Sequence, residues 1–198
     1  MALERLLPRL PRDFSAPVLV VQHMPKLFTS ALAERLDRCC GLRVKQAVAG
    51  ETLRAGTVWL APGDSHMEVK HVGDNEPQLV LHQGDPVHHC RPAADLLFRS
   101  MARTAGAGVL GLVLTGMGAD GVEGARAIVA AGGSVLAQDE ASSAVWGMPG
   151  RVVAAGLARA VMSLEAMGDE LIALSSSRVL NRPAARSAEA YREAGHGV

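Results

Sequence analysis

The sequence predicts an α/β protein with a doubly wound, mostly parallel sheet and helices on both faces. Short β-branched apolar runs alternate along the chain with segments of helical periodicity, the order typical of parallel sheets. Hydrophobic residues make up 48% of the 198 positions and charged residues 20%, a composition typical of folded globular domains. The 21 glycines fit a compact chain with many tight turns. We therefore expect a self-sufficient core.

The first elements are a helix, a buried strand and a second helix. Leucines at helical spacing predict an amphipathic helix over 2–10, with a proline inside it that should shorten it. The continuous apolar run at 18–22 is typical of a buried parallel strand. Residues 27–38 return to helical spacing, and Thr29 or Ser30 is the expected N-cap.

The middle and the last third follow the same alternation. Glycine-containing turns separate four short extended segments, at 42–48, 57–61, 67–71 and 78–82. The expected elements after them are helices at 93–105, 122–131, 149–155 and 164–175, and strands at 109–114 and 134–137. From residue 176 the chain turns polar, so we predict one domain over 1–175 and a disordered tail over 176–198.

Charge and composition exclude several classes of function. Twenty basic and 20 acidic side chains leave no net charge, and only 3% of residues are aromatic, so neither a nucleic-acid surface nor an anionic-membrane surface is expected. The three cysteines, Cys39, Cys40 and Cys90, have no C-x-x-C spacing and predict no disulfide framework. No signal peptide and no membrane span is evident. We expect a soluble, cytoplasmic protein.

Candidate functional residues follow the predicted strands, because sites in parallel sheets lie beyond the carboxyl ends of strands. His23 comes directly after the strand at 18–22, and Pro25 stiffens its turn. An imidazole fixed there is a candidate general base, since its pKa lies near neutrality. The alternative is a loop histidine that hydrogen-bonds to the backbone.

The glycine loop at 115–121 is open to three interpretations. Its G-x-G-x-x-G pattern, with Asp139 and Glu140 about 20 residues further on, fits a dinucleotide-binding fingerprint. Against this, the Asp120 carboxylate would repel a pyrophosphate. Asp120 would instead suit the orientation of a histidine from a neighbouring strand end, or it could be a helix cap.

Two further clusters carry weaker signals. Asp64 and His66 lie in a Pro-Gly-Asp sequence, which is typical of a turn. Histidines, an aspartate and a cysteine gather before Arg91, but their spacing matches no common zinc site, so we predict no metal. These residues are His82, Asp85, His88, His89 and Cys90.

Six short motifs in order resemble one family. They are Gln-His-Met-Pro at 22–25, Ala-Pro-Gly-Asp-Ser-His-Met at 61–67, Arg-Pro-Ala-Ala-Asp at 91–95, Leu-Thr-Gly-Met-Gly-Ala-Asp-Gly at 114–121, Gln-Asp-Glu-Ala-Ser at 138–142 and Gly-Met-Pro at 147–149. Together they resemble the catalytic domain of CheB-type chemotaxis protein-glutamate methylesterases, over about residues 1–175.

The resemblance implies an esterase without a cofactor. It implies hydrolysis of glutamate γ-methyl esters on chemoreceptor cytoplasmic helices, and often deamidation of receptor glutamines, by a Ser-His-Asp triad. His23 corresponds to the triad histidine and Asp120 to the triad aspartate. The backbone N–H of Met117 would serve the oxyanion site. The implied partners are methylated receptor helices, with no nucleic acid and no direct membrane insertion.

The departures from the family pattern concern its nucleophile. The family's serine lies in a Gly-Ala-Ser-Thr-Gly-Gly turn between its first strand and first helix, whereas residues 1–7 resemble that helix itself. We therefore expect a fold that lacks the family's first strand, contains no nucleophile, and is impaired as an enzyme. No substitute hydroxyl sits on a glycine-flanked turn; those considered are Ser15, Thr29, Ser65 and Ser142. The alternatives are a non-catalytic receptor-binding module and a dinucleotide-binding protein.

Overall fold

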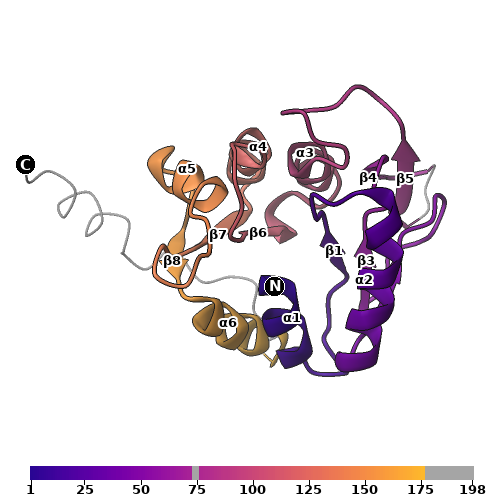
Figure 1. Cartoon of the computed structure of the whole chain (residues 1–198), viewed down its shortest axis with the longest axis horizontal. Coiled ribbons are helices and arrows are strands. Elements are labelled where there is room, and N and C mark those ends of the chain that lie inside the picture. The colour runs from indigo at the N-terminus through magenta and orange to yellow at the C-terminus, as the bar shows by residue number, and fades with distance from the viewer. Residues whose placement is uncertain (73–75, 177–198) are drawn as a thin grey trace, which may run out of the picture.

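The computed structural model describes residues 1–72 and 76–176, and it has the predicted α/β architecture. Figure 1 shows the parallel strands in a central layer, with α3 (Ala94–Ala105), α4 (Val122–Ala130) and α5 (Met148–Ala154) on one side and α1 (Ala2–Leu6) and α6 (Leu164–Ser176) on the other. The predicted tail over 177–198 lies outside the described residues. In the described ranges, no helix is long and apolar enough to cross a membrane.

The first half contains both of the helices and all five of the strands that were predicted for it. The α-helix predicted over 2–10 ends at Leu6, because the following 3-10 turn has Pro8, which lacks an N–H donor, at its start. The elements are α1 (Ala2–Leu6), η1 (Leu7–Arg9), β1 (Val18–Val20), α2 (Lys26–Cys39), β2 (Arg43–Gln46), β3 (Thr57–Leu60), β4 (His66–Lys70) and β5 (Gln78–His82).

The expected cap of α2 was wrong. The N-cap is Pro25, and Thr29 lies inside the first turn with its side chain buried. The Thr29 hydroxyl donates to the Lys26 carbonyl at 3.0 Å, within its own helix. Proline at this boundary has the extended backbone that an N-cap needs, which periodicity alone could not reveal.

The second half follows the predicted order with two additions, the 3-10 turn η2 and the strand β8. The elements are α3 (Ala94–Ala105), η2 (Gly106–Gly108), β6 (Leu110–Val113), α4 (Val122–Ala130), β7 (Ser134–Gln138), α5 (Met148–Ala154), β8 (Ala160–Met162) and α6 (Leu164–Ser176). Strand β8 was not predicted, because it has one β-branched residue, Val161, and lacks the β-branched run that marked the strand at 18–22.

The parallel strands form two sheets of three rather than one continuous sheet. One has the order β1-β3-β2 and the other β6-β7-β8, and every pair within them is parallel. β4 and β5 form a separate antiparallel hairpin. Within the described residues, β1 pairs only with β3 and β6 pairs only with β7.

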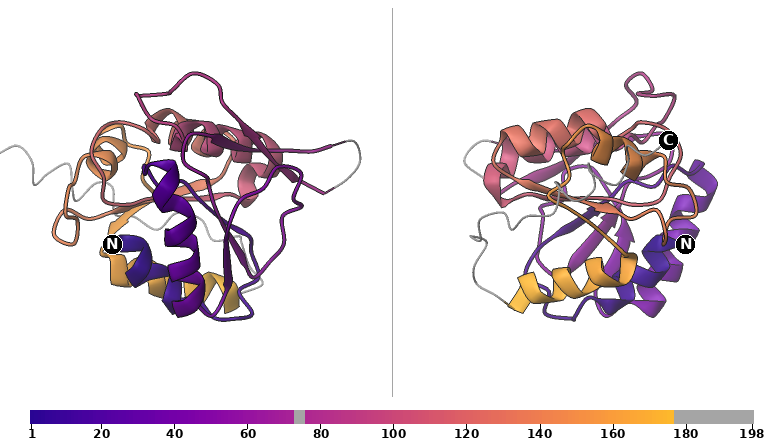
Figure 2. Two further views of the ribbon diagram at one scale, coloured as in Figure 1. Left: turned by 45° about the vertical axis from the view of Figure 1, so that its right-hand side comes forward. Right: turned by 90° about the vertical axis from the view of Figure 1, so that its left-hand side faces the viewer.

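Helices cover opposite faces because successive strand residues point in opposite directions. In β7, Leu136 packs into the core cluster that contains α1, α2 and α6, whereas Val135 packs into the cluster that contains α4 and α5. Figure 2 shows the same two helical layers from the side. This is the doubly wound arrangement, and it gathers the loops after β1 and β6.

Candidate functional site

The structure brings His23 and Asp120 into direct contact. His23 follows β1, and Asp120 lies in the loop between β6 and α4, 97 positions later in the chain. Nε2 of His23 lies 2.7 Å from Oδ2 of Asp120. The histidine side chain is partly exposed, whereas the carboxylate is almost fully buried. The arrangement is a base held by a buried carboxylate at the carboxyl edge of two parallel sheets.

Backbone donors fix the Asp120 carboxylate from the other side. The N–H of Ala94 donates to Oδ2 at 2.6 Å and the N–H of Asp95 donates to Oδ1 at 2.9 Å. Both donors belong to the first turn of α3, where helix N–H groups have no intrahelical partner. Asp120 therefore caps α3 and holds His23 at the same time, whereas the N-cap of its own helix α4 is Gly121.

The Asp120 carboxyl is held in its charged form. Burial by itself raises its pKa, but the hydrogen bonds from His23, Asp95 and Ala94 outweigh burial and leave the pKa below its ordinary value of 3.8. A carboxylate that stays ionised can fix the tautomer of the imidazole and stabilise its protonated form.

A turn after β3 supports the His23 loop. A Cβ at Gly63 would lie 2.6 Å from Cα of Lys26 and 2.7 Å from the Met24 carbonyl oxygen, so only glycine allows this approach. The Gly63 N–H donates to Oγ1 of Thr29 at 3.2 Å, and Nε2 of Gln46 donates to the same oxygen at 2.7 Å. The Pro-Gly-Asp sequence therefore forms a turn, as predicted, and braces the histidine.

The loop from Thr115 to Gly121 is anchored by the segment before α5. The Gly116 N–H donates to the Val145 carbonyl at 2.9 Å, and the Met148 N–H donates to the Gly116 carbonyl at 2.7 Å. Gly118 and Gly121 have φ values of +103° and +94°, which favour glycine. The Met117 side chain is 84% exposed. Within the described residues, its backbone N–H donates to no protein acceptor.

Gln138 is a supporting residue that the sequence analysis missed. Its buried side chain ends β7 and accepts the Thr115 N–H at 2.8 Å, while its Nε2 donates to the Ser142 carbonyl at 2.8 Å. It therefore fixes the start of the Asp120 loop against the loop that follows β7. The sequence signal that could have identified it is a polar residue at the end of an apolar strand.

An open cleft of about 450 Å³ lies beside His23. Its far wall is the loop before α3, where Arg91 forms an ion pair with Asp64 through Nη2 at 2.5 Å and Nε at 2.9 Å. Arg91 also donates through Nη1 to the Gly84 carbonyl at 2.9 Å. The cleft is lined by His23, Met24, Pro25, Lys26, Asp64, His89, Cys90, Arg91 and Pro92.

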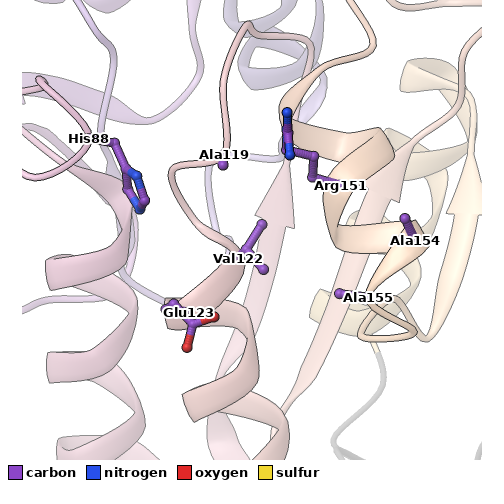
Figure 3. Close-up of a pocket in the computed structure, with 7 residues that line it drawn as sticks. All are labelled: His88, Ala119, Val122, Glu123, Arg151, Ala154 and Ala155. Carbon is purple, nitrogen blue, oxygen red and sulfur yellow. The ribbon is translucent and has the colours of Figure 1, made fainter.

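A second cleft, of about 390 Å³, lies beside the Asp120 loop, where Ala119 is part of its lining (Figure 3). His88 stands on one wall and Arg151, from α5, on the other. Nε2 of His88 lies 3.1 Å from Oδ2 of Asp95, which is fully buried. Asp95 and His88 thus form a second His–Asp pair, which the sequence analysis did not identify.

The histidine-rich cluster before Arg91 does not converge on one point. His82 bonds to Glu68 at 2.9 Å, whereas His88 bonds to Asp95. His66 is fully buried and its Nε2 lies 3.1 Å from the Asp85 carbonyl. Among the residues that the structure describes, no three His, Cys, Asp or Glu side chains are placed to hold a metal ion.

None of the candidate substitute nucleophiles hydrogen-bonds to the His23 ring. Thr29 is engaged in the support of the turn, and Oγ of Ser142 donates to Asp139 at 2.6 Å. Ser15 is exposed near the start of β1, and Ser65 lies in the turn before β4. In residues 1–72 and 76–176, no serine, threonine or cysteine hydrogen-bonds to the His23 ring. The dinucleotide-binding interpretation of the glycine loop stays a prediction.

Comparisons with known proteins give one consistent family. A family model described as CheB methylesterase matches residues 1–171. A protein-glutamate methylesterase/protein-glutamine glutaminase from Nocardioides is 53% identical over 171 residues, which cover 86% of this chain and 46% of that protein. One from Caulobacter vibrioides is 48% identical over 167 residues, covering 84% of this chain and 48% of that protein. The chain thus spans about half the length of these curated relatives.

A solved structure gives the same result for the fold. The crystal structure of the Thermotoga maritima CheB methylesterase catalytic domain is 38% identical and superposes with a TM-score of 0.85. The match covers 87% of this chain and 91% of that one. At this identity and coverage, sequence and structure agree, and the chain belongs to the CheB methylesterase family.

Proposed function

We propose that this chain supplies the general base and its orienting carboxylate for hydrolysis of glutamate γ-methyl esters on the cytoplasmic helices of chemoreceptors. The observation that carries the proposal is the 2.7 Å contact between Nε2 of His23 and the buried Asp120 carboxylate. Because Nε2 faces Asp120, Nδ1 is the ring nitrogen left to exchange a proton with a nucleophile. The relatives' names, protein-glutamate methylesterase/protein-glutamine glutaminase, point to the same chemistry.

The steps follow from this geometry. His23 takes the proton of the attacking hydroxyl, whose oxygen forms a bond to the ester carbonyl carbon. The negative charge passes to the carbonyl oxygen, which in this proposal the Met117 N–H stabilises; the support is that this N–H has no protein acceptor within the described residues. The protonated His23 gives its proton to the departing methoxide, which leaves as methanol. It then activates water, which releases glutamate and restores the hydroxyl.

Deamidation of glutamine requires the same groups. The amide carbonyl is attacked in the same way, and ammonia leaves in place of methanol. No redox step and no net transfer of a group to a cofactor occurs in either reaction, so no cofactor is required. Receptor helices of this kind face the cytoplasm, and we place the protein there.

The attacking hydroxyl comes, in this proposal, from outside the described residues. The support is that no hydroxyl or thiol in the described ranges bonds to His23. Residues 1–198 alone should therefore turn over slowly, because loss of one triad member removes most of the rate and leaves oxyanion stabilisation and binding. If they bind methylated receptors without hydrolysing them, the chain is a receptor-binding module.

The test is methanol release from methylated receptor membranes. Residues 1–198 are compared with the same chain preceded by a strand and a Gly-Ala-Ser-Thr-Gly-Gly turn. We expect release only from the extended form, and a loss of roughly 10²–10⁴-fold when His23→Gln or Asp120→Asn is introduced there. His71→Gln, on an exposed residue after β4, is the matched control. An extended form that hydrolyses equally well with His23→Gln would overturn the proposal.

A further inference from the structure

We propose that the rim of the His23 cleft is a docking surface for an acidic amphipathic helix. In this proposal Leu27, Phe28 and Met117 contact apolar side chains of that helix, and Lys26 pairs with a carboxylate near the ester. The inference rests on the proposed function, because it specifies which surface selects the ester-bearing helix and by what chemistry.

The apolar part of the rim lies on the two segments that the His23–Asp120 contact joins. Leu27 and Phe28, in the first turn of α2, are 84% and 58% exposed. Met117, three positions before Asp120, is 84% exposed. Val145, 48% exposed, adjoins Met117 because its carbonyl accepts the Gly116 N–H. Leu27 and Phe28 directly follow Lys26, which lines the cleft, and exposed apolar side chains beside a cleft mark interaction surfaces.

The charge of the cleft favours an anionic partner. Asp64 and Arg91 neutralise each other, and the Arg91 guanidinium is further occupied by the Gly84 carbonyl. Asp120 is buried and faces His23. The Lys26 side chain is exposed on the cleft wall, and among the described residues no carboxylate pairs with it. A cation is thus left three positions after the proposed base.

The second cleft, beside the Asp120 loop, offers another cation. The Arg151 guanidinium stands on the wall opposite His88 (Figure 3), and no carboxylate in the described part of the chain forms an ion pair with it. Glu123, in the same cleft, is 3.6 Å from Arg126. Lys26 lines the cleft beside His23, and Arg151 lines the cleft beside Ala119, the neighbour of Asp120.

The chemistry of the substrate supplies the matching pattern. In this proposal the helix has glutamates three or four positions from the ester, one helical turn away. Side chains at this spacing lie on one helix face, about 5–6 Å apart. An ester presented to His23 would then bring a neighbouring carboxylate to Lys26, while apolar residues on the adjacent stripe meet Leu27, Phe28 and Met117.

The test measures binding, so it needs no turnover. The probes are two fluorescein-labelled, stapled helical peptides of about 20 residues, each with a central glutamate γ-methyl ester. One has glutamates one turn before and after the ester, and the other has glutamines there. Fluorescence anisotropy gives the Kd of each peptide for residues 1–198 at low and at high salt.

We expect the glutamate peptide to bind more tightly at low salt. Lys26→Glu should raise the Kd of the glutamate peptide about 5-fold or more and change the Kd of the glutamine peptide by less than about 2-fold. Phe28→Ser should raise the Kd of both peptides by roughly 5- to 10-fold, because the contact made by this exposed aromatic side chain does not depend on the charge of the peptide. Lys70→Glu, on β4, is the matched charge control, and Val129→Ser, at the far end of α4, is the matched apolar control.

Several outcomes would overturn the proposal. Equal Kd values for the two peptides would mean that charge does not select the helix. If Lys70→Glu changed the Kd as much as Lys26→Glu does, the effect would not be specific to Lys26. If sedimentation instead reveals a dimer that Phe28→Ser abolishes and the peptides do not displace, a second copy covers the rim. The Kd values and the methanol assay are independent, so failure of docking and failure of the esterase proposal give different results.

Discussion

Asp95 and Asp120 hold the starts of two adjacent helices together. Oδ1 of Asp120 accepts the Asp95 N–H at 2.9 Å, at the start of α3, and Oδ1 of Asp95 accepts the Gly124 N–H at 2.6 Å, at the start of α4. Both carboxylates are buried. Because the helices pack against each other here, a Cβ at Gly124 would lie only 3.0 Å from Cα of Asp95. The position of Asp120, and hence of His23, is thus set by the contact between α3 and α4.

The first prediction concerns this link. Asp95→Ala leaves the buried Gly124 N–H without its acceptor, and an unsatisfied buried donor costs about 1–3 kcal/mol. The free energy of unfolding, measured by urea denaturation, should fall by that amount. Asp13→Ala, at an exposed aspartate, is the control and should change it by less than about 0.5 kcal/mol. Equal effects of the two substitutions would contradict the structural role of Asp95.

The second prediction concerns pH. The pKa of Asp120 is below 3.8 in the folded protein, so its carboxylate stabilises the fold above 3.8, and this contribution is lost as the pH falls through the folded pKa. The difference in unfolding free energy between the wild type and Asp120→Asn should be constant near neutral pH and shrink below 3.8. Urea unfolding between neutral and acidic pH measures it. A difference that grows on acidification would refute the lowered pKa.

The third prediction concerns the close approach at Gly63. Gly63→Ala forces its Cβ into the backbone of Lys26 and Met24, neither of which can move without shifting the His23 loop. We expect a loss of about 1–3 kcal/mol in stability. Gly108→Ala, where no atom lies within 4 Å of the added Cβ, is the matched control.

NMR distinguishes a general loss of stability in Gly63→Ala from a displacement of the His23 loop. The His23 ring resonances should shift with Gly63→Ala, because the contact with Asp120 depends on the loop position, and should stay unchanged with Gly108→Ala. Unaltered His23 resonances in Gly63→Ala would mean that the turn after β3 does not brace the histidine.

The fourth prediction concerns the adjacent cysteines at the end of α2. Burial, and then the neighbouring Cys39 thiol, raise the pKa of Cys40 to about 12. Because the thiolate is the reactive form, iodoacetamide at pH 8 should label the exposed Cys39 and leave Cys40 unmodified. Peptide mass spectrometry of the briefly labelled, folded protein distinguishes them, and denatured protein should label at both positions. Preferential labelling of Cys40 would contradict its burial.

The sequence by itself determined the order of the elements and the regions where function resides. Helical and strand periods predicted each long element to within a few residues, because burial of one face imposes its period on the chain. Sites in parallel sheets lie beyond the carboxyl ends of strands, so the strands predicted at 18–22 and 109–114 pointed to His23 and Asp120. Sequence patterns could not reveal β8, which lacks a β-branched run, or the cap of α2, which depends on backbone angles.

Only the tertiary structure decided how these pieces meet. Which strands pair depends on contacts between distant segments, so the division into β1-β3-β2 and β6-β7-β8 has no local signal. Asp120 illustrates the same limit at the site. Sequence left it as a cap, a histidine partner or part of a nucleotide loop, and the fold makes it both the cap of α3 and the partner of His23. A buried carboxylate takes the donors that packing brings to it, and those donors lie 25 and 97 positions away in the chain.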